Sequence, residues 1–440
     1  MPKDHGKRAL LLTVGTGDVT KLEETLFIPL RKSISDGQFN QVILLPSQFT
    51  KDFADSVSQD LQDLRVTAEP LPTGHLENDA DACYAHYSVV IDKLRANGFK
   101  RHEIMVDFTR GTKAMSAALV LAAVRHGLPR LRYIVGQRDE RGMVKPGSED
   151  IRDTSTTVVT GHLRLDAARR FFERGNFAAA LDALPDPAHQ LAKLYPSDVL
   201  EWSAYLRPLA QFYAEWDRLD YKAAASIKLG APPSASSDWD HFKITDEMRQ
   251  WVSELAKDLP ESSQDKAQRL RRLAADLLAN GERRIRDRQF EDAIIRAYRV
   301  LELVGQLRLF EKNLDSEKLP SDHPAVKKVD EETKRKGRNG LSKGPNNCLT
   351  AGRENVARIL RCLEDPLADE LFKLGDRPSI RASDRNLSVL IHGFKAVSPA
   401  DEDKLKELYK RLDALLFKDG GEAAGQRLAL ARSLNFSRQA

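Results

Sequence analysis

The sequence predicts an α/β domain built on a parallel sheet at the N-terminus, and an all-helical region after it. Two observations lead to this prediction. Over roughly the first 160 residues, short apolar segments alternate with longer segments of helical periodicity, which is typical of a parallel sheet covered by helices on both faces. After about residue 162 the strand-like segments stop and helical periodicity dominates.

Five apolar segments are expected to form the sheet. They span residues 8–14, 41–45, 65–71, 102–108 and 131–135. Helical patterns fill the intervals. They cover residues 18–37, the residues from the end of the second segment to about 63, and residues 78–97 and 112–126. Residues 137–147 are rich in turn formers and residues 154–160 alternate weakly, so we expect a hairpin or arm at the end of this domain.

The helical region contains two segments that resemble each other. Residues 172–184 and 285–301 each have the pattern of a helix, a short turn with an aromatic residue and an Ala-rich helix, which predicts two helical hairpins. A Pro/Ser linker separates them at residues 229–237. Residues 351–376 and 401–418 are also expected to be helical, and the residues after 420 to be a frayed helix or tail.

A basic segment interrupts the helical pattern at residues 312–350. Within it, residues 327–343 hold seven basic and three acidic side chains, a net charge of +4. The simpler interpretation is a solvated loop that contains Gly and Asn. The alternative is an arm that contacts RNA phosphates.

Composition limits the classes of protein that the chain can belong to. Its 440 residues allow about two to four domains, and 41% hydrophobic with 30% charged residues suits a soluble protein with real cores. The three cysteines, Cys83, Cys348 and Cys362, are far apart and have no paired spacing, so the sequence indicates no disulfide framework or zinc knuckle. No signal peptide or membrane span is apparent, so we expect a cytoplasmic protein without membrane association. The net charge of +4 means that any basic surface is local.

Two predicted strands end in loops that contain glycine and threonine. The first ends in Gly15-Thr16-Gly17-Asp18, and the fourth runs into a turn that extends from Asp107 to Lys113. Strands one and four commonly flank the ligand crevice of a doubly wound sheet. Glycine, hydroxyl groups and helix N-terminal amides suit an anionic or polar ligand there, and two cations from Arg110 and Lys113 add to this.

These loops do not match the common nucleotide-binding fingerprints. The first loop lacks the third glycine of a dinucleotide-binding turn, and no acidic residue ends the second strand. The order Gly111-Thr112-Lys113 is the reverse of the order in a phosphate-binding P-loop. Helix capping by Thr16, Asp18, Thr109 and Thr112 is the alternative interpretation of both loops.

A second candidate site lies near the C-terminus, in the segment from Arg385 to Gly393. Arg385 and His392 are seven residues apart, so on a helix they share one face, with Leu387, Leu390 and Ile391 on the other. An imidazole can transfer a proton near neutral pH, and a guanidinium can bind phosphate oxygens. The pair therefore suits phosphodiester chemistry. The alternative is an ordinary surface arginine and a histidine at a helix end.

Both sites resemble motifs of known families. The segment Asp107-Phe-Thr-Arg-Gly-Thr-Lys-Ala-Met115 resembles the Asp-x-Thr-Gly-Gly-Thr-Lys-x-Met turn of CARF domains, the Rossmann-like sensors of cyclic oligoadenylate in type III CRISPR systems. The segment from Arg385 to His392 is similar to the Arg-x4–6-His signature of HEPN ribonucleases. CARF–HEPN proteins carry the two domains in this order. Arg110 departs from the pattern, which prefers glycine at that position.

The resemblance implies a three-part chain: a CARF-like sensor at 1–160, a helical linker at 161–280 and a HEPN-like ribonuclease at 281–440. It implies a homodimer with a composite active site, a cyclic oligoadenylate activator, a single-stranded RNA substrate, and no cofactor or metal. The implied catalytic residues are Arg385, Asn386 and His392. The implied ligand-binding residues are Gly15, Thr16, Gly17, Asp18, Thr109, Arg110, Gly111, Thr112 and Lys113.

Alternative functions remain open at this point. The chain could be a non-catalytic sensor or scaffold, or its sensor domain could also degrade the ligand, with Thr16, Thr112 and Lys113 as candidates. A DNA-cutting effector on the same sensor would need a carboxylate cluster in a strand context, which the helical C-terminal half does not offer. Glu302 is expected to be a packing residue ahead of the HEPN motif.

Overall fold

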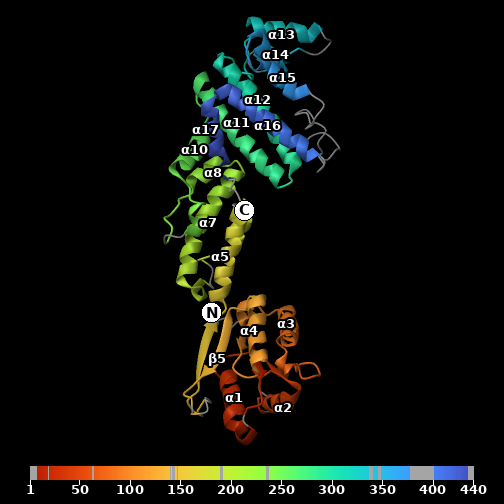
Figure 1. The fold of residues 1–440 in the computed structure, drawn as a ribbon, viewed down its shortest axis with the longest axis vertical. Helices are drawn as coiled ribbons and strands as arrows, with labels where there is room; N and C mark the ends of the chain where they lie inside the picture. Colours follow the sequence, from red (N-terminus) through yellow and green to blue (C-terminus); the bar gives the residue numbers. More distant parts are fainter. Residues whose placement is uncertain are drawn as a thin grey trace, which may run out of the picture. The chain divides into compact units, whose positions relative to one another are not determined.

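The computed structural model divides the chain into two compact units (Figure 1). One contains Met1–Ala168 and Asp182–Ala204, and the other contains Arg169–Leu181 and Tyr205–Ala440. The residues that the structure describes are 7–17, 19–61, 64–138, 140, 144–145, 147–188, 192–233, 237–335, 340–344, 348–376 and 401–434. The three-part division expected from the sequence stays a prediction.

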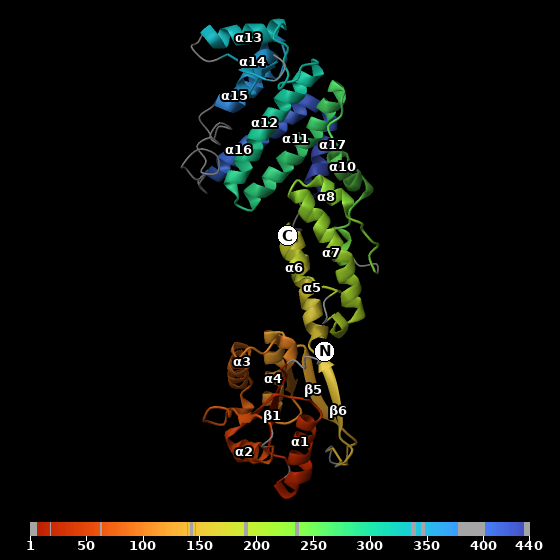
Figure 2. The same ribbon diagram turned by 180° about the vertical axis from the view of Figure 1, so that it is seen from behind.

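The first unit is built on a six-stranded sheet with the strand order β3-β2-β1-β4-β5-β6. The parallel strands are β1 Ala9–Val14, β2 Gln41–Pro46, β3 Val66–Ala68, β4 Ile104–Asp107 and β5 Arg130–Val135. The last strand, β6 Asp150–Ser155, runs antiparallel to β5, and the two lie side by side in Figure 2. This confirms the predicted α/β domain and its terminal hairpin.

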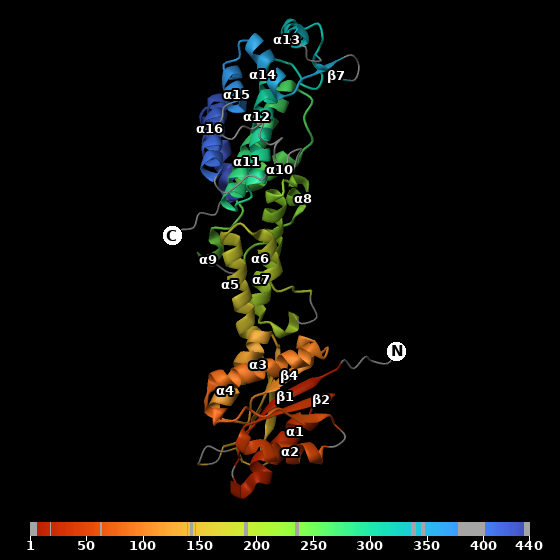
Figure 3. The same ribbon diagram turned by 90° about the vertical axis from the view of Figure 1, so that its right-hand side faces the viewer.

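The central strands are apolar throughout because helices cover both faces of the sheet. Leu10 and Leu12 of β1 point into a core with α1 Ile28–Ser35 and α2 Lys51–Asp60. Leu11, between them, points into the opposite core. That core includes α3 Ala80–Ala96 and α4 Lys113–His126. Figure 3 shows the strands lying between these two helix pairs.

Three details of the first unit differ from the sequence-based expectation. β3 covers three residues, Val66–Ala68, although Glu69 and Leu71 still donate their N–H groups to carbonyls of β2 at 2.8 and 2.9 Å. β6 ends at Ser155 and α5 Thr157–Glu173 begins almost at once, so 157–160 is helix and not strand. The helix expected at 18–37 is divided into a 3-10 turn, Val19–Lys21, a π-helical turn, Glu23–Phe27, and α1.

Helices make up most of the described residues in the remaining chain. They are α6 Phe177–Ala183, α7 Ser197–Asp217, α8 Tyr221–Ser226, α9 Ser237–Asp240, α10 Asp246–Ala256, α11 Ser263–Arg286, α12 Phe290–Glu311, α13 Pro324–Arg335, α14 Arg353–Cys362, α15 Ala368–Asp376, α16 Glu402–Gly420 and α17 Glu422–Ala431. Both predicted hairpins are present, as α5–α6 and α11–α12. The long α11–α12 pair forms the centre of the second unit, and α14, α16 and α17 pack on it. None of the helices in the described ranges is long and apolar enough to cross a bilayer.

The structure corrects three expectations for the helical region. Residues 324–335 form helix α13 and not a loop, because Val326, Val329 and Thr333 make a buried stripe within a charged sequence. Strands do occur after residue 162: β7 Ser342–Lys343 and β8 Leu349–Thr350 form a short antiparallel ladder. The segment after 420 is not frayed up to residue 434, since Leu428, Ala431 and Leu434 are buried.

Candidate functional site

The loops that follow β1 and β4 emerge at the same edge of the sheet. The two strands are neighbours, with Leu12 paired with Asp107, and β2 lies on the other side of β1. From β1, the strand order therefore continues to β2 and β3 on one side and to β4 and β5 on the other. In doubly wound sheets such a reversal leaves a crevice at the carboxyl ends of the strands, where ligands bind.

The two glycine loops are in direct contact. A Cβ atom on Gly15 would lie 2.7 Å from the backbone nitrogen of Gly111, closer than side-chain carbons approach backbone. Gly111 has a φ of 117°, which L-residues rarely adopt, and a Cβ there would meet Thr13. Arg110 does not have a positive φ, so the backbone accepts a side chain where the CARF pattern has glycine.

Asp107 and Thr109 together hold the second loop in place. The Asp107 Oδ1 atom accepts hydrogen bonds from the Thr109 backbone N–H at 2.8 Å and from its hydroxyl at 2.5 Å. The same hydroxyl accepts a bond from the Ile134 N–H at 2.9 Å, and Asp107 Oδ2 accepts one from Ser33. The Thr109 hydroxyl is therefore engaged in tying β4 to β5.

Thr112 has a comparable structural task at the start of α4. Its Oγ1 accepts a hydrogen bond from the Met115 N–H at 3.2 Å, as an N-cap does, and donates one to the Glu77 carbonyl. The helix-capping alternative thus describes what this hydroxyl does in the structure. Contact of Thr109 and Thr112 with a ligand stays a prediction.

Other predicted residues at this edge present groups to solvent. Thr16, Gly17 and Lys113 are exposed. Arg110 is partly buried, and its Nε has no hydrogen-bond partner among the described residues. Burial lowers the pKa of the Arg110 guanidinium, while Asp107 and Glu149 act to raise it. Asp18 lies outside the described residues.

Sequence reasoning missed an aromatic pair at the same edge. Phe49, in the turn after β2, stacks on His75, in the loop before α3, with ring centroids 5.1 Å apart and planes at 29°. Phe49 remains 60% exposed. The only sequence signal was a lone aromatic residue just after a strand end, and such a residue has no pattern to identify it.

The predicted catalytic residues Arg385, Asn386 and His392 lie outside the described residues. An ion-pair network holds the helices on either side of them in sequence. Arg308 of α12 donates to Asp365 from Nε at 3.0 Å and from Nη2 at 2.8 Å, and Asp365 accepts from the Leu367 N–H before α15. Arg308 also pairs with Asp419 of α16 at 3.4 Å.

A second arginine, Arg271 of α11, completes this network. Its Nε donates to Asp419 at 2.6 Å, and it also pairs with Glu311. Desolvation would lower the pKa of Arg271, but the hydrogen bonds with Asp419 and Glu311 outweigh it and raise the pKa. The carboxylates of Asp365 and Asp419 are almost fully buried, so they depend on these guanidinium groups.

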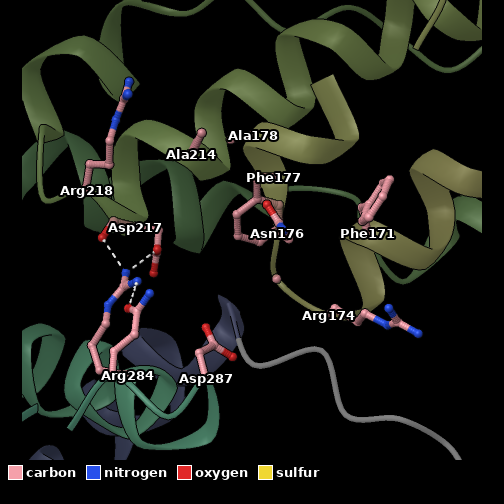
Figure 4. Close-up of a pocket in the computed structure, with 12 residues that line it drawn as sticks. Phe171, Arg174, Asn176, Phe177, Ala178, Ala214, Asp217, Arg218, Arg284 and Asp287 are labelled. Atoms are coloured by element: carbon pink, nitrogen blue, oxygen red, sulfur yellow. Dashed lines mark hydrogen bonds and ion pairs between the residues drawn. The ribbon is translucent and has the colours of Figure 1, made fainter. Parts of the chain in front are cut away.

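The second unit contains a charged cavity of about 380 Å³ at the turns of the two helical hairpins (Figure 4). Three helices end there: α5, α7 and α11. The second residue after each helix has a left-handed backbone. These residues are Gly175, Leu219 and Arg288, with φ of 70°, 67° and 60°. The residue after each one donates its N–H back to a carbonyl of the last turn, as in a Schellman cap.

Arginines in and around this cavity bind groups at those helix ends. Arg284, which lines the cavity, and Arg283 both bind Asp217, and Arg286 donates to the Arg174 carbonyl at 3.1 Å. Burial alone would raise the pKa of Asp217, but the two guanidinium groups lower it. Cations near a helix C-terminus stabilise the helix. We therefore regard this cavity as a place where helix ends are held together, and not as a ligand site.

In the described ranges, no three His, Cys, Asp or Glu side chains are grouped as a metal ion would require.

Comparisons with known proteins agree with the architecture of the chain. Residues 263–416 match the family model described as the Csm6 HEPN domain. No protein among those with curated descriptions matches the chain. Among solved structures, Enterococcus italicus Csm6 bound to cyclic hexa-2′-fluoro-hexa-dAMP matches with a TM-score of 0.56 at 12% identity, over 98% of this chain and 99% of that one.

Two further structures match only loosely. They are Can2 from Sulfobacillus thermosulfidooxidans in complex with cyclic tetra-adenylate and protein VC1899 from Vibrio cholerae, both at 12% identity over 61% of this chain. They are covered to 66% and 68%, and their TM-scores of 0.22 and 0.23 are too low to support an argument. Residues 263–416 thus match the Csm6 HEPN domain, and the chain as a whole shares its fold with Csm6.

Proposed function

We propose that the protein is an endoribonuclease that cyclic oligoadenylate activates and that cleaves single-stranded RNA without a metal ion in CRISPR defence. The observation that carries this proposal is the match of residues 263–416 to the Csm6 HEPN domain. That range includes Arg385 and His392, with the seven-residue spacing of the HEPN signature.

The first unit is the proposed sensor. Its glycine loops meet at the switch point of the sheet, where exposed Lys113 and half-buried Arg110 can approach an anionic ligand. A guanidinium and an ammonium are suited to the phosphates of a cyclic nucleotide. The Csm6 with the same fold is bound to a cyclic hexanucleotide analogue, which supports this class of activator.

The proposed reaction uses the RNA itself as the nucleophile. The 2′-oxygen of one nucleotide bonds to the adjacent phosphorus, and the bond from phosphorus to the 5′-oxygen of the next nucleotide breaks. His392 transfers a proton from the 2′-hydroxyl to the departing 5′-oxygen, and Arg385, followed in sequence by Asn386, stabilises the charge on the phosphate oxygens. The products are a 2′,3′-cyclic phosphate and a 5′-hydroxyl.

We further propose a homodimer in which both chains contribute Arg385 and His392 to one cleft. Activation then requires that the ligand binds more tightly to the sensor arrangement that accompanies a competent cleft. Light scattering would give the mass of the particle with and without activator. A monomeric, fully active particle would contradict the composite cleft.

The decisive experiment mixes full-length protein with labelled single-stranded RNA in EDTA, with cyclic tetra-adenylate, cyclic hexa-adenylate or neither. We expect cutting only with an activator, and a loss of about 100-fold or more in His392→Ala. His162→Ala, a change of a half-exposed histidine on α5, is the matched control and should cut normally. Cutting that persists in His392→Ala would overturn the site, and equal cutting without ligand would overturn the activation. Analysis of the nucleotide in the same reactions tests whether the sensor degrades its activator.

A further inference from the structure

The stacked pair Phe49–His75 is unusual because both rings face solvent. Phe49 is 60% exposed, and the side chain of His75 is 79% exposed. The rings nevertheless stack at 5.1 Å, so they form one flat aromatic surface outside any core. An exposed aromatic surface of this kind at a ligand edge suits contact with another flat ring.

The position of Phe49 is fixed by its neighbours in the turn. The Thr50 hydroxyl donates a hydrogen bond to the carbonyl of Val14, the last residue of β1, at 2.9 Å. It also accepts one from the Ser47 N–H at 2.9 Å. The turn that carries Phe49 is therefore attached directly to the strand end that leads into Gly15.

The loop that carries His75 is attached on two sides. The Gln48 side chain donates to the Leu71 carbonyl at 2.5 Å, which ties the start of this loop to the Phe49 turn. The Thr112 hydroxyl donates to the Glu77 carbonyl, which ties its end to the second glycine loop. The aromatic pair thus lies beside both loops of the proposed sensor site.

From this placement we infer that Phe49, backed by His75, is a stacking platform for one adenine base of the activator. The inference rests on the proposed function, because it assigns a specificity residue to the same site. The glycine loops, with Arg110 and Lys113, supply groups suited to phosphates, while their one aromatic side chain, Phe108, packs against the core and stacks on Tyr133. The aromatic pair supplies that surface, and aromatic rings bind bases mainly by stacking.

A competing explanation is that the two rings only shield each other from water. Under that explanation, removal of Phe49 changes the local stability of the turn and leaves ligand affinity unchanged. The platform makes a different prediction: affinity follows the aromatic character of residue 49, while the rate of RNA cleavage at saturating activator does not change.

The test measures binding of cyclic tetra-adenylate and cyclic hexa-adenylate to the full-length protein by calorimetric titration. We expect Phe49→Ala to weaken binding by roughly 5- to 100-fold, the range for loss of one base–aromatic stack. Phe49→Leu should also weaken it, because leucine keeps apolar area without a ring, and Phe49→Tyr should restore affinity. Val89→Ala, which changes a similarly exposed apolar residue on α3, is the control and should bind normally.

A fluorescence experiment detects stacking of the base on residue 49 directly. In Phe49→Trp, activator should quench fluorescence beyond the change seen in the wild type, since an adenine would lie on the new indole. Unchanged affinity in Phe49→Ala, with normal binding by the wild type, would overturn the platform alone. If the wild type binds neither cyclic tetra-adenylate nor cyclic hexa-adenylate, the proposed sensor function is overturned, and so is the assignment of an adenine to the platform.

Discussion

Gly15 lies so close to the backbone of Gly111 that residue 15 cannot carry a side chain without moving the second glycine loop. The Cβ of an alanine at residue 15 would lie 2.7 Å from the Gly111 nitrogen, and one at residue 111 would meet Thr13 at a backbone φ of 117°. The close approach of the two loops therefore depends on glycine in both positions.

The first prediction concerns this contact. Gly15→Ala should separate the two loops and weaken activator binding by about tenfold or more, with a loss of stability of about 1–3 kcal/mol from overpacking. Binding is measured by titration and stability by thermal unfolding. Gly230→Ala, at a position where a Cβ would meet nothing within 4 Å, is the control. Normal affinity in Gly15→Ala would show that the loop contact does not shape the ligand site.

The second prediction concerns the buried pair Arg308–Asp365. Arg308→Met leaves the buried Asp365 carboxylate without its forked partner, which should destabilise the second unit by about 3–5 kcal/mol. Tryptophan fluorescence in urea reports mainly this unit, since three of the four tryptophans, Trp216, Trp239 and Trp251, belong to it and Trp202 belongs to the first unit. Arg299→Met, which breaks a more exposed pair with Glu302, should cost about 0.5 kcal/mol or less. Equal losses in the two variants would contradict the assigned role of burial.

The third prediction concerns pH. The pKa of Asp217 is lowered in the folded state, so its ion pairs stabilise the protein above the ordinary aspartate pKa of about 3.9. This contribution is lost as the pH falls through the lowered folded-state pKa. Asp217→Asn should therefore reduce stability at pH 7 by about 2–4 kcal/mol, and the difference from wild type should shrink below about pH 4. A difference that is constant from pH 7 to pH 2 would contradict this account.

The fourth prediction compares two equivalent helix ends. Gly175→Ala should cost about 1–2 kcal/mol, because alanine is strained at a φ of 70° and its Cβ would lie 2.8 Å from Arg286. Arg288→Gly relieves the same strain at the end of α11 and should gain up to about 1 kcal/mol. Urea unfolding of both variants checks the opposite signs. A loss of stability in Arg288→Gly would mean that its side chain matters more than its backbone.

The fold was largely predictable because burial on both sides of a parallel sheet leaves a strong signal. The mainly apolar segments Ala9–Val14 and Gln41–Pro46 are short and closely followed by Gly15 and Ser47, which favours buried strands. Helix α13 was missed because its buried stripe consists of few residues within a run of charges. The short β7–β8 ladder has no apolar pattern of its own and forms only through tertiary contacts.

The site was predictable in part. The glycines and their neighbouring strands could be assigned because positive φ and close approach leave few other residues possible. The sequence could not show whether the hydroxyls of Thr109 and Thr112 stabilise the loop or bind a ligand. Both roles favour a threonine at the same position of the turn. Phe49 and His75 are 26 positions apart and meet only in the folded chain.

The antiparallel direction of β6 has a consequence for the proposed activation. β5 ends at the edge where the glycine loops lie, and β6 returns beside it, so that Ser155 pairs with Arg130 at the opposite edge. Helix α5 begins just beyond, at Thr157. A displacement caused by ligand must therefore travel the full length of a six-residue strand, about 20 Å, before it reaches the first turn of α5. The Arg132–Asp153 ion pair at 2.9 Å adds a side-chain link between the two strands along this path.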